Sequence, residues 1–360
     1  MQNQIQSILE QLIAEGNERG VQLAVYKDGK LVVDAWAGVA NATEGTPVDG
    51  ETLFPIFSTG KGIVATLAHL MVERGLISYD TRIAEVWPEF GACGKEGITL
   101  RQALNHSSGI PHMPRGIGFK EMCAWETMCE KIAQLTPLWE PGTKVEYHAM
   151  TYGWIVGEVV RRVDGRPFAQ CMEEEIKEPL GINGLYMGIP DSVEGQVAIL
   201  EHPGAGIPEV KMEGPETVPS WMGPLYDIMN RPDVRRACIP ATAGIGNARS
   251  IARHYAALLP GGVDGISLLP EHRIRLATER QGPEPGSEDS PKQWALGYQI
   301  CAAYPFFGNR VSTFGHDGFG GSIGFADPEL RLAVGFTRNL YGAEDKRAAI
   351  FGELRKELGL

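Results

Sequence analysis

Apolar residues recur at helical spacing over residues 3–15, and the period then changes to that of strands. Two apolar runs, 21–26 and 31–37, flank the tetrapeptide Lys-Asp-Gly-Lys, and Asp-Gly between such runs is a strong hairpin signal. A second hairpin is predicted for residues 321–326 and 330–337, around an Asp-Pro-Glu turn. The pattern therefore places strands near both ends of the chain.

The middle of the chain, residues 58–190, has a mainly helical pattern without a convincing strand pair. Helices are predicted at 62–75, 99–105, 121–135, 151–163 and 167–178, and a last one at 344–358. A helix-rich insert between strand-forming ends predicts an α+β fold, with an antiparallel sheet flanked by helices and a helical subdomain folded against it. The seam between sheet and subdomain is a natural cleft.

We expect one domain over residues 1–360. Its sheet-containing part comprises about 1–57 and 240–360, and its mainly helical part comprises about 58–202. The segment 203–243 is nearly aperiodic and rich in Gly, Pro and Met. It is too long for a simple connection, so we expect it to form a lid or a pocket wall.

Charge and composition narrow the choice of partners. The 360 residues include 33 Lys and Arg and 45 Asp and Glu, which gives a net charge of −12. An acidic chain without a basic run repels phosphate backbones and anionic lipids, so we expect a small-molecule partner and neither nucleic acid nor membrane. The sequence shows neither a secretory signal nor a run of about 18 apolar residues, which predicts a cytoplasmic location.

The six cysteines form no Cys-x-x-Cys pair and are predicted to be reduced packing residues. They are Cys93, Cys123, Cys129, Cys171, Cys238 and Cys301.

Ser58 and Lys61 stand at the start of a predicted helix that is apolar on nearly every side and must therefore be buried. The i, i+3 spacing places Lys61 on the same helical face as Ser58. Burial disfavours the charged ammonium, so a neutral Lys61 could accept the proton of Ser58. The alternative is a helix-capping serine followed by a solvent-facing lysine, but this helix has almost no polar face for that lysine.

Several segments in a fixed order resemble the motifs of the serine β-lactamase and penicillin-binding-protein superfamily. They are Ser58-Thr59-Gly60-Lys61, the run Leu-Asn-His-Ser-Ser-Gly-Ile-Pro at 104–111, Trp-Glu-Pro-Gly-Thr at 139–143, Tyr147-His148-Ala149 and Gly315-His316-Asp317-Gly318. The resemblance covers nearly the whole chain and is closest to the class C-like carboxylesterases called family VIII esterases. It implies a β-lactamase/transpeptidase-like fold, a single catalytic domain, and ester hydrolysis through a Ser58 acyl-enzyme without a metal or organic cofactor.

The same resemblance implies roles for further residues. Tyr147 would share the Ser58 proton with Lys61 and deliver it to the leaving alkoxide. The backbone N–H groups of Ser58 and Phe319 would hold the oxyanion. The residues expected to bind substrate are His148, His316, Asp317, Gly318 and Gly320. For Asp317 the sequence leaves two roles open, orientation of His316 or capping of a turn.

Two departures from the family pattern bear on the substrate. The asparagine of the Tyr-x-Asn motif is Ala149, and the lysine of the Lys-Thr-Gly motif is His316. Both family side chains are expected to hold the amide and carboxylate of a lactam antibiotic, so an esterase is favoured over a β-lactamase or D-alanyl-D-alanine peptidase. An acyl transferase or transesterase would use the same residues and stays open. A non-catalytic scaffold is disfavoured because Ser58, Lys61 and Tyr147 are all present.

Two other possible sites have less support in the sequence than the Ser58 site. The run Gly-Gly-Ser-Ile-Gly around Ser322 fits the nucleophile elbow of α/β-hydrolases, but that elbow requires a downstream histidine, and His316 is the last histidine of the chain. We expect Ser322 to be a strand residue. His106, His112 and His148 lack metal-ligand spacing, so no metal site is predicted, and His106 is expected to brace the loop beside the Ser58 helix.

Overall fold

The computed structural model describes most of the chain. The described residues are 1–202, 216–281, 293–303, 305–308, 310–341 and 347–360.

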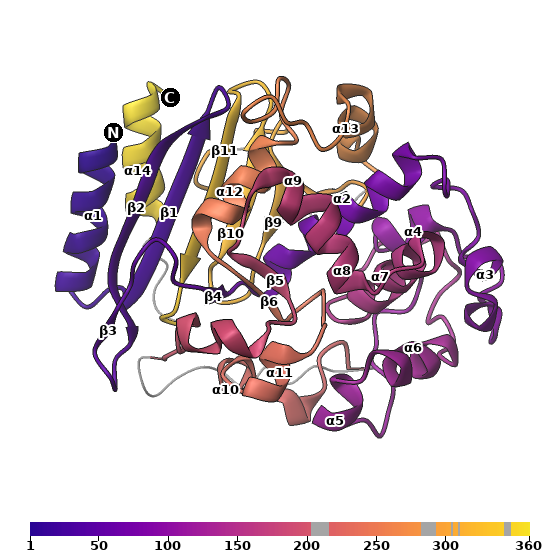
Figure 1. The fold of residues 1–360 in the computed structure, drawn as a ribbon. Helices are drawn as coiled ribbons and strands as arrows, with labels where there is room; N and C mark the ends of the chain where they lie inside the picture. The colour runs from indigo at the N-terminus through magenta and orange to yellow at the C-terminus, as the bar shows by residue number, and fades with distance from the viewer. Residues whose placement is uncertain (203–215, 282–292, 304, 309, 342–346) are drawn as a thin grey trace.

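Eight antiparallel strands form the main sheet, in the order β3-β2-β1-β11-β10-β9-β8-β7 (Figure 1). The strands are β1 Gly20–Lys27, β2 Lys30–Asn41, β3 Thr46–Pro47, β7 Gln293–Trp294, β8 Gln299–Ile300, β9 Phe314–Asp317, β10 Ile323–Asp327 and β11 Leu332–Arg338. Strand β1 pairs along its length with β11, from Val21 opposite Arg338 to Lys27 opposite Leu332. Strands from the two ends of the chain thus form one sheet, as the sequence predicts.

Both predicted hairpins are confirmed. Strands β1 and β2 meet at Asp28 and Gly29, whose φ angles are 51° and 72°. Positive φ at both central residues is what a two-residue hairpin turn requires to match the twist of its strands, and Asp-Gly adopts it readily. Strands β10 and β11 form the second hairpin.

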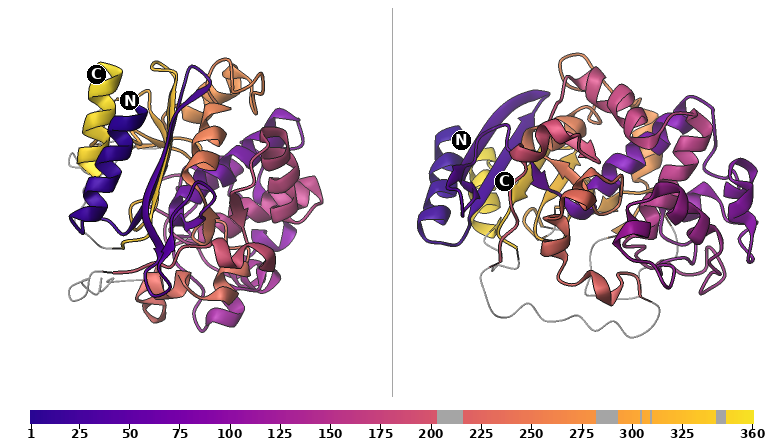
Figure 2. Two further views of the ribbon diagram at one scale, coloured as in Figure 1. Left: turned by 60° about the vertical axis from the view of Figure 1, so that its left-hand side comes forward. Right: turned by 60° about the horizontal axis from the view of Figure 1, so that its bottom comes forward.

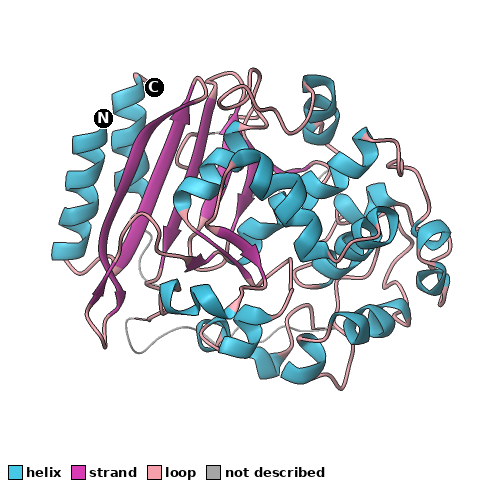
Figure 3. Cartoon of the chain, in the orientation of Figure 1, coloured by secondary structure: helices cyan, strands magenta, loops and turns pink. Residues whose placement is uncertain are grey.

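Helices cover both faces of the sheet (Figures 1 and 2). Helices α1 Gln2–Ala14 and α14 Arg347–Leu358 lie on one face, where their apolar side chains share a core with the strands. Helix α12 Ala248–Ala256 lies on the other face, between the sheet and the helical part of the chain. The sheet is therefore the middle layer of an α+β architecture, which is the predicted fold class (Figure 3).

A second, smaller sheet joins three short strands in the order β4-β6-β5. They are β4 Phe54–Pro55, β5 Leu185–Met187 and β6 Gly244–Gly246. Strand β5 lies within the region 58–190, for which the sequence predicts no strand pair, and it pairs with β6 from outside that region. Two or three residues are too short to show a period, so the pattern misses this sheet.

The helical part follows the prediction with local breaks. Its α-helices are α2 Gly60–Glu73, α3 Ile83–Val86, α4 Leu100–Leu104, α5 Phe119–Met122, α6 Trp125–Ala133, α7 Thr151–Asp164, α8 Phe168–Met172 and α9 Glu178–Leu180. The single helix predicted at 121–135 is two helices, and the one at 167–178 contains a π-helical turn at Glu173–Lys177. Helix α2 is buried from Gly60 to Val72, as an all-round apolar helix must be.

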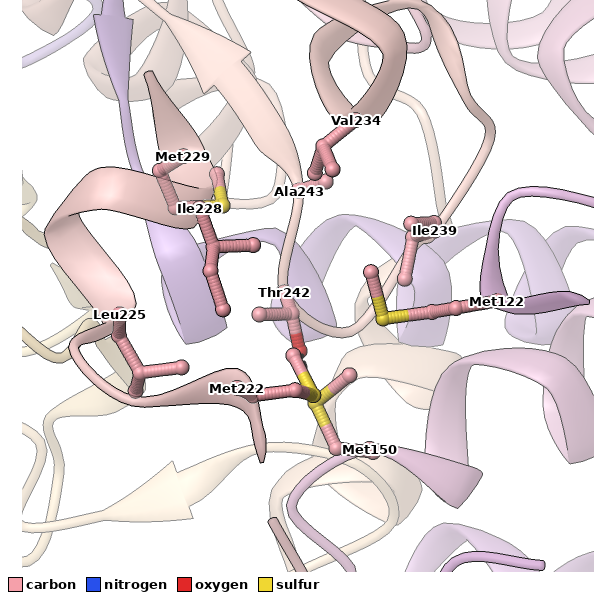
Figure 4. Close-up of a pocket in the computed structure, with 10 residues that line it drawn as sticks. All are labelled: Met122, Met150, Met222, Leu225, Ile228, Met229, Val234, Ile239, Thr242 and Ala243. Atoms are coloured by element: carbon pink, nitrogen blue, oxygen red, sulfur yellow. Dashed lines mark hydrogen bonds between the residues drawn. The ribbon is translucent and has the colours of Figure 1, made fainter. Parts of the chain in front are cut away.

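The segment expected to form a lid or pocket wall lies partly outside the described residues, at 203–215. Its described portion contains α10 Leu225–Met229 and α11 Pro232–Arg236. Helix α13 Glu271–Thr278 lies between α12 and α14 in the chain. Figure 4 shows how the portion with α10 and α11 packs. The residues around a cavity of about 10 Å³ are Met122, Met150, Met222, Leu225, Ile228, Met229, Val234, Ile239, Thr242 and Ala243. This volume is at the lower limit for one water molecule, so the methionines leave almost no empty space where these segments pack together.

All six cysteines are free, and Cys129, Cys171 and Cys301 are buried as packing residues. Cys93 is exposed, so the expectation of a packing role is wrong for this residue, which stands in a tight turn with φ 60°. In the part of the chain that the structure describes, no helix is long and apolar enough to cross a membrane.

Candidate active site

Ser58 lies at the junction between the small sheet and helix α2. A 3₁₀ turn, Phe57–Thr59, leads from strand β4 into the helix. Phe57 has a φ of 49°, a conformation that costs energy for a bulky side chain. Its ring is held by edge contact with Phe319 and a tilted contact with Tyr341, at centroid distances of 6.3 and 6.0 Å. Packing thus secures the strained turn that presents Ser58.

Lys61 lies directly beside Ser58, as the i, i+3 spacing predicts. Its Nζ is 2.9 Å from Ser58 Oγ and donates to two backbone carbonyls, those of Ala149 and Ala241, at 2.7 Å each. The side chain is fully buried. Desolvation holds the pKa of Lys61 well below its ordinary value, and the negative charge of Asp317 opposes this shift. Burial thus shifts the protonation equilibrium of this amine toward the neutral form, and the amine is in contact with the serine hydroxyl.

Tyr147 approaches Ser58 and Lys61 from the loop before α7. Its hydroxyl interacts with Ser58, and the Nζ of Lys61 lies 4.9 Å from the centre of its ring. Burial raises the pKa of Tyr147, while the interaction with Ser58 works in the opposite direction. The phenol therefore stays protonated near neutral pH and can pass its proton on.

An open pocket of about 510 Å³ adjoins Ser58. Its lining residues are Ser58, Tyr147, Trp294, Gln299, Asp317, Gly318, Phe319, Gly320, Gly321 and Arg347. Of the residues that the sequence singles out, the structure thus brings Ser58, Tyr147, Asp317 and the turn 318–320 together at one opening.

The turn between β9 and β10 forms one wall of this pocket. It is closed by the N–H of Gly321, which donates to the carbonyl of Gly318 at 3.0 Å, so Phe319 is at its second position. A side chain at Gly318 would meet Ser322 Oγ at 2.2 Å and the Ile56 carbonyl at 2.3 Å. Only glycine permits this close approach of the turn to the Ser58 loop.

Ser322 faces away from the pocket. Its hydroxyl donates to the carbonyl of Ile56 at 2.7 Å and lies 3.0 Å from Thr59 Oγ1, and its side chain is buried. The residue stands directly before strand β10, so a strand and not a helix follows it immediately. The nucleophile elbow suggested by the sequence around Ser322 therefore lacks its structural context.

His148 does not line the pocket, contrary to the expectation that it binds substrate. Its Nε2 accepts from the N–H of Ile110 at 3.0 Å and lies 2.9 Å from the Ser108 hydroxyl, while Nδ1 lies 2.6 Å from the Glu146 carbonyl. Burial lowers the pKa of His148 to about 4, so the ring is neutral. Both ring nitrogens are committed to holding loops, which leaves neither for a substrate.

His316 differs in the same way from the expectation. The side chain is 1% exposed and its Nδ1 donates to the carbonyl of Asp317 at 2.6 Å. Its ring lies behind Tyr147 and Trp294, with centroids 6.0 and 5.7 Å away. The neighbouring Asp317 does line the pocket. The two neighbours differ because successive side chains of strand β9 point to opposite faces of the sheet.

His106 braces the neighbouring loop, as predicted. Its Nδ1 accepts from the N–H of His148 at 3.2 Å, and its carbonyl accepts from the N–H of Glu146 at 3.1 Å. Its ring contacts both Tyr147 and Trp294. Within the described ranges, no three His, Cys, Asp or Glu side chains are grouped so that they could hold a metal ion.

Four residues at or beside the site escaped the sequence analysis: Ala241, Trp294, Gln299 and Arg347. Ala241 contributes only its carbonyl, and any residue has one. Trp294 and Gln299 come from two-residue strands without a periodic signal. Arg347 begins a helix whose distance from the pocket cannot be read from its own sequence.

Comparison with known proteins agrees with this geometry. The chain is 33% identical to the esterase/beta-lactamase LipL of Mycobacterium tuberculosis over 335 residues, which cover 89% of this chain and 77% of that protein. A solved family VIII carboxylesterase is 30% identical with a TM-score of 0.88, covering 99% of this chain and 97% of the other. A penicillin-binding protein homologue from Caulobacter crescentus is 32% identical with a TM-score of 0.86, covering 98% and 96%.

These neighbours share the β-lactamase/transpeptidase-like fold expected from the sequence. The family described as Beta-lactamase matches residues 5–355, nearly the whole chain. With this match, and with the serine and lysine of the Ser-x-x-Lys motif in contact at the mouth of a pocket, the chain belongs to the beta-lactamase family.

Proposed function

We propose that this protein is a serine carboxylesterase that cleaves small-molecule esters through a covalent acyl-enzyme on Ser58. The observation that carries the proposal is the 2.9 Å contact between Lys61 Nζ and Ser58 Oγ, with Lys61 fully buried. The esterases among its relatives support ester hydrolysis as the reaction. We further propose that residues 1–360 act as one catalytic domain, in which the described part of the segment, 216–243, contributes the Ala241 carbonyl beside Lys61.

In the acylation step, Ser58 Oγ attacks the ester carbonyl carbon while its proton passes to Lys61. The N–H groups of Ser58 and Phe319 receive the oxyanion that forms. The bond between the carbonyl carbon and the alcohol oxygen then breaks, and Tyr147 delivers a proton to that oxygen while Lys61 returns its proton to Tyr147. In the second step water attacks the acyl carbon and loses a proton to Lys61. The bond to Ser58 Oγ then breaks, and Oγ receives that proton by way of Tyr147, which releases the acid and restores both Ser58 and neutral Lys61. The proposed mechanism requires no cofactor.

The pocket supports a small substrate bound beside an open turn. Asp317, Gly318 and Gly320 line it, and the glycines let an acyl or alcohol group approach the backbone closely. Phe319 is 53% exposed, so its ring offers an apolar surface at the opening. We include these residues in the substrate site and leave out His148 and His316, whose rings are buried behind it.

The test is the mass of the intact protein after incubation with a p-nitrophenyl ester and, separately, with a fluorophosphonate. We expect one acyl or phosphonyl adduct on the wild-type chain and none on Ser58→Ala, which also loses at least ~1,000-fold in kcat/KM. Ser322→Ala is the matched control and retains the adduct and substantial activity. An adduct that survives Ser58→Ala and disappears with Ser322→Ala would refute the proposal.

A second candidate, hydrolysis of lactams, is favoured by one observation: the Mycobacterium relative is named as both an esterase and a β-lactamase. Two residues argue against lactam hydrolysis. The side chain of Ala149 cannot form a hydrogen bond, and the position at which the family pattern has a lysine holds the buried His316. Incubation with a penicillin in the same mass experiment distinguishes the two candidates.

A further inference from the structure

A hydrogen bond between Thr242 and Met150 connects the two backbone segments that hold Lys61. The amine donates to the carbonyls of Ala149 and Ala241 at 2.7 Å each. The residues that directly follow these two carbonyls are Met150 and Thr242. The Thr242 hydroxyl donates to the sulfur of Met150 at 2.9 Å (Figure 4). A closed loop of contacts therefore runs from Lys61 through both segments.

This connection lies in a buried and largely apolar part of the core. Thr242 is 8% exposed and Met150 is 1% exposed. The apolar cavity beside them has a volume of about 10 Å³, at the lower limit for one water molecule, so a substitution of equal volume opens no further space for water. A hydrogen bond to a thioether is weak in water, but in surroundings of low dielectric it is stronger.

We propose that Thr242 is a positioning residue for Lys61, acting by holding the Ala149 and Ala241 carbonyls at a fixed separation. The inference rests on the proposed function, in which neutral Lys61 is the base. It adds a residue that is not among those lining the pocket beside Ser58.

The chemistry of a neutral amine explains why this separation matters. Neutral Lys61 has two N–H bonds and one lone pair. When each N–H is directed at one carbonyl, the lone pair is directed at the hydroxyl of Ser58, ready to accept its proton. If either carbonyl moves away, the amine rotates and the lone pair loses its direction.

The same displacement changes the protonation of Lys61. Both carbonyl oxygens stabilise the ammonium form, so their withdrawal lowers the pKa of Lys61 further as long as water stays out. The titratable groups that face this amine in the described structure are Tyr147, Asp317 and His106. A substitution at Thr242 leaves all three in place.

The test compares Thr242→Val with Thr242→Ser, because valine keeps the volume and removes the hydroxyl while serine retains it. Two rates are measured against pH: turnover of p-nitrophenyl acetate and fluorophosphonate labelling of Ser58. For Thr242→Val we expect the acid limb of both profiles to move down by ~0.5 pH unit. We also expect kcat to fall ~5-fold at an unchanged KM. Thr242→Ser should match the wild type.

Thr337→Val is the matched control, since Thr337 is also buried and donates to Gln22 Oε1 at 3.2 Å, outside the pocket. Met150→Leu removes the sulfur acceptor and should reproduce the effect of Thr242→Val. The double variant should be no worse than either single one, because both remove the same bond.

A Thr242→Val profile that superposes on that of Thr337→Val would overturn the inference. If circular dichroism shows that Thr242→Val does not fold, Met150→Leu takes its place, and a wild-type pH profile of Met150→Leu would overturn the inference. A wild-type chain that hydrolyses no ester but is labelled at Ser58 would refute the proposed function alone, since the labelling profiles still test Thr242. Failure of labelling as well would refute both.

Discussion

The indole of Trp294 lies nearly parallel to the phenol ring of Tyr147, with ring centroids 5.4 Å apart and an angle of 12° between the planes. His106 contacts both rings from behind. The stack fixes the plane of Tyr147, and with it the direction of the hydroxyl that interacts with Ser58. Trp294 also lines the pocket, so one residue both positions Tyr147 and forms part of the wall.

Trp294→Ala should therefore lower kcat by ~10-fold, which corresponds to about 1.4 kcal/mol and is the usual size of a stacking contribution. Trp294→Phe retains an aromatic face and should recover most of the loss. Steady-state kinetics on p-nitrophenyl butyrate measure both variants. Full turnover by Trp294→Ala would show that Tyr147 does not depend on the stack.

The activity should depend on pH through Lys61. Because burial lowers the pKa of this amine, the fraction of neutral Lys61 and the rate rise with pH through an apparent pKa well below the ordinary ~10.4. Lys61→Arg should be nearly inactive at every pH, since a guanidinium does not give up its proton. A pH series of kcat/KM provides the measurement. Near-normal turnover of Lys61→Arg would exclude Lys61 as the base.

Gly153 in helix α7 allows the Ala241 segment to lie against the helix. A Cβ at this position would stand 2.5 Å from the backbone nitrogen of Ala241. Gly153→Ala should displace that segment, move its carbonyl from Lys61 and lower kcat by ~10-fold. Gly352→Ala is the control, because its Cβ meets nothing within 4 Å in helix α14. It should keep full activity and gain ~0.5 kcal/mol of stability. Equal activities of the two variants would contradict the close approach.

Esters should be better substrates than lactams. Loss of the two family contacts at Ala149 and His316 removes ~2 to 5 kcal/mol of transition-state binding for a lactam, whereas an ester acyl group needs neither contact. We expect kcat/KM on p-nitrophenyl acetate to exceed that on nitrocefin by at least ~100-fold. Comparable values would mean that other groups of the pocket hold the lactam.

Stability should fall in mild acid because buried histidines, among them His69, His148 and His254, have lowered pKa values in the folded chain. Burial lowers the pKa of His69 and His254 to about 3 and that of His148 to about 4. Below pH 6.5 the unfolded chain takes up protons that the folded chain refuses, so the free energy of unfolding decreases as pH falls. Between pH 7 and pH 5 each histidine should contribute about 2 kcal/mol to that decrease.

Urea denaturation at the two pH values measures this decrease. His254→Gln keeps a polar group that can face Thr66 but cannot titrate, so it should show a smaller decrease. If the free energy of unfolding of this variant decreases between pH 7 and pH 5 by as much as that of the wild type, His254 does not contribute to the decrease.

Local features of this protein could be read from its sequence. The hairpin at Asp28-Gly29 follows from two residues that accept positive φ, and the burial of helix α2 follows from its apolar residues on all sides. The contact between Ser58 and Lys61 is of the same kind, because residues three apart on a helix share a face. The catalytic role of Tyr147, in contrast, was inferred only from the resemblance to a known family.

The groups that surround Ser58 and Lys61 were decided by the tertiary structure alone. The Ala241 carbonyl reaches Lys61 across 180 positions of the chain, and no local pattern marks a backbone carbonyl as an acceptor. His148 and His316 looked like substrate ligands in their motifs, but the fold turned both rings into the interior. A histidine binds substrate or braces a loop according to the groups that face it, and those groups are brought together only when distant segments pack.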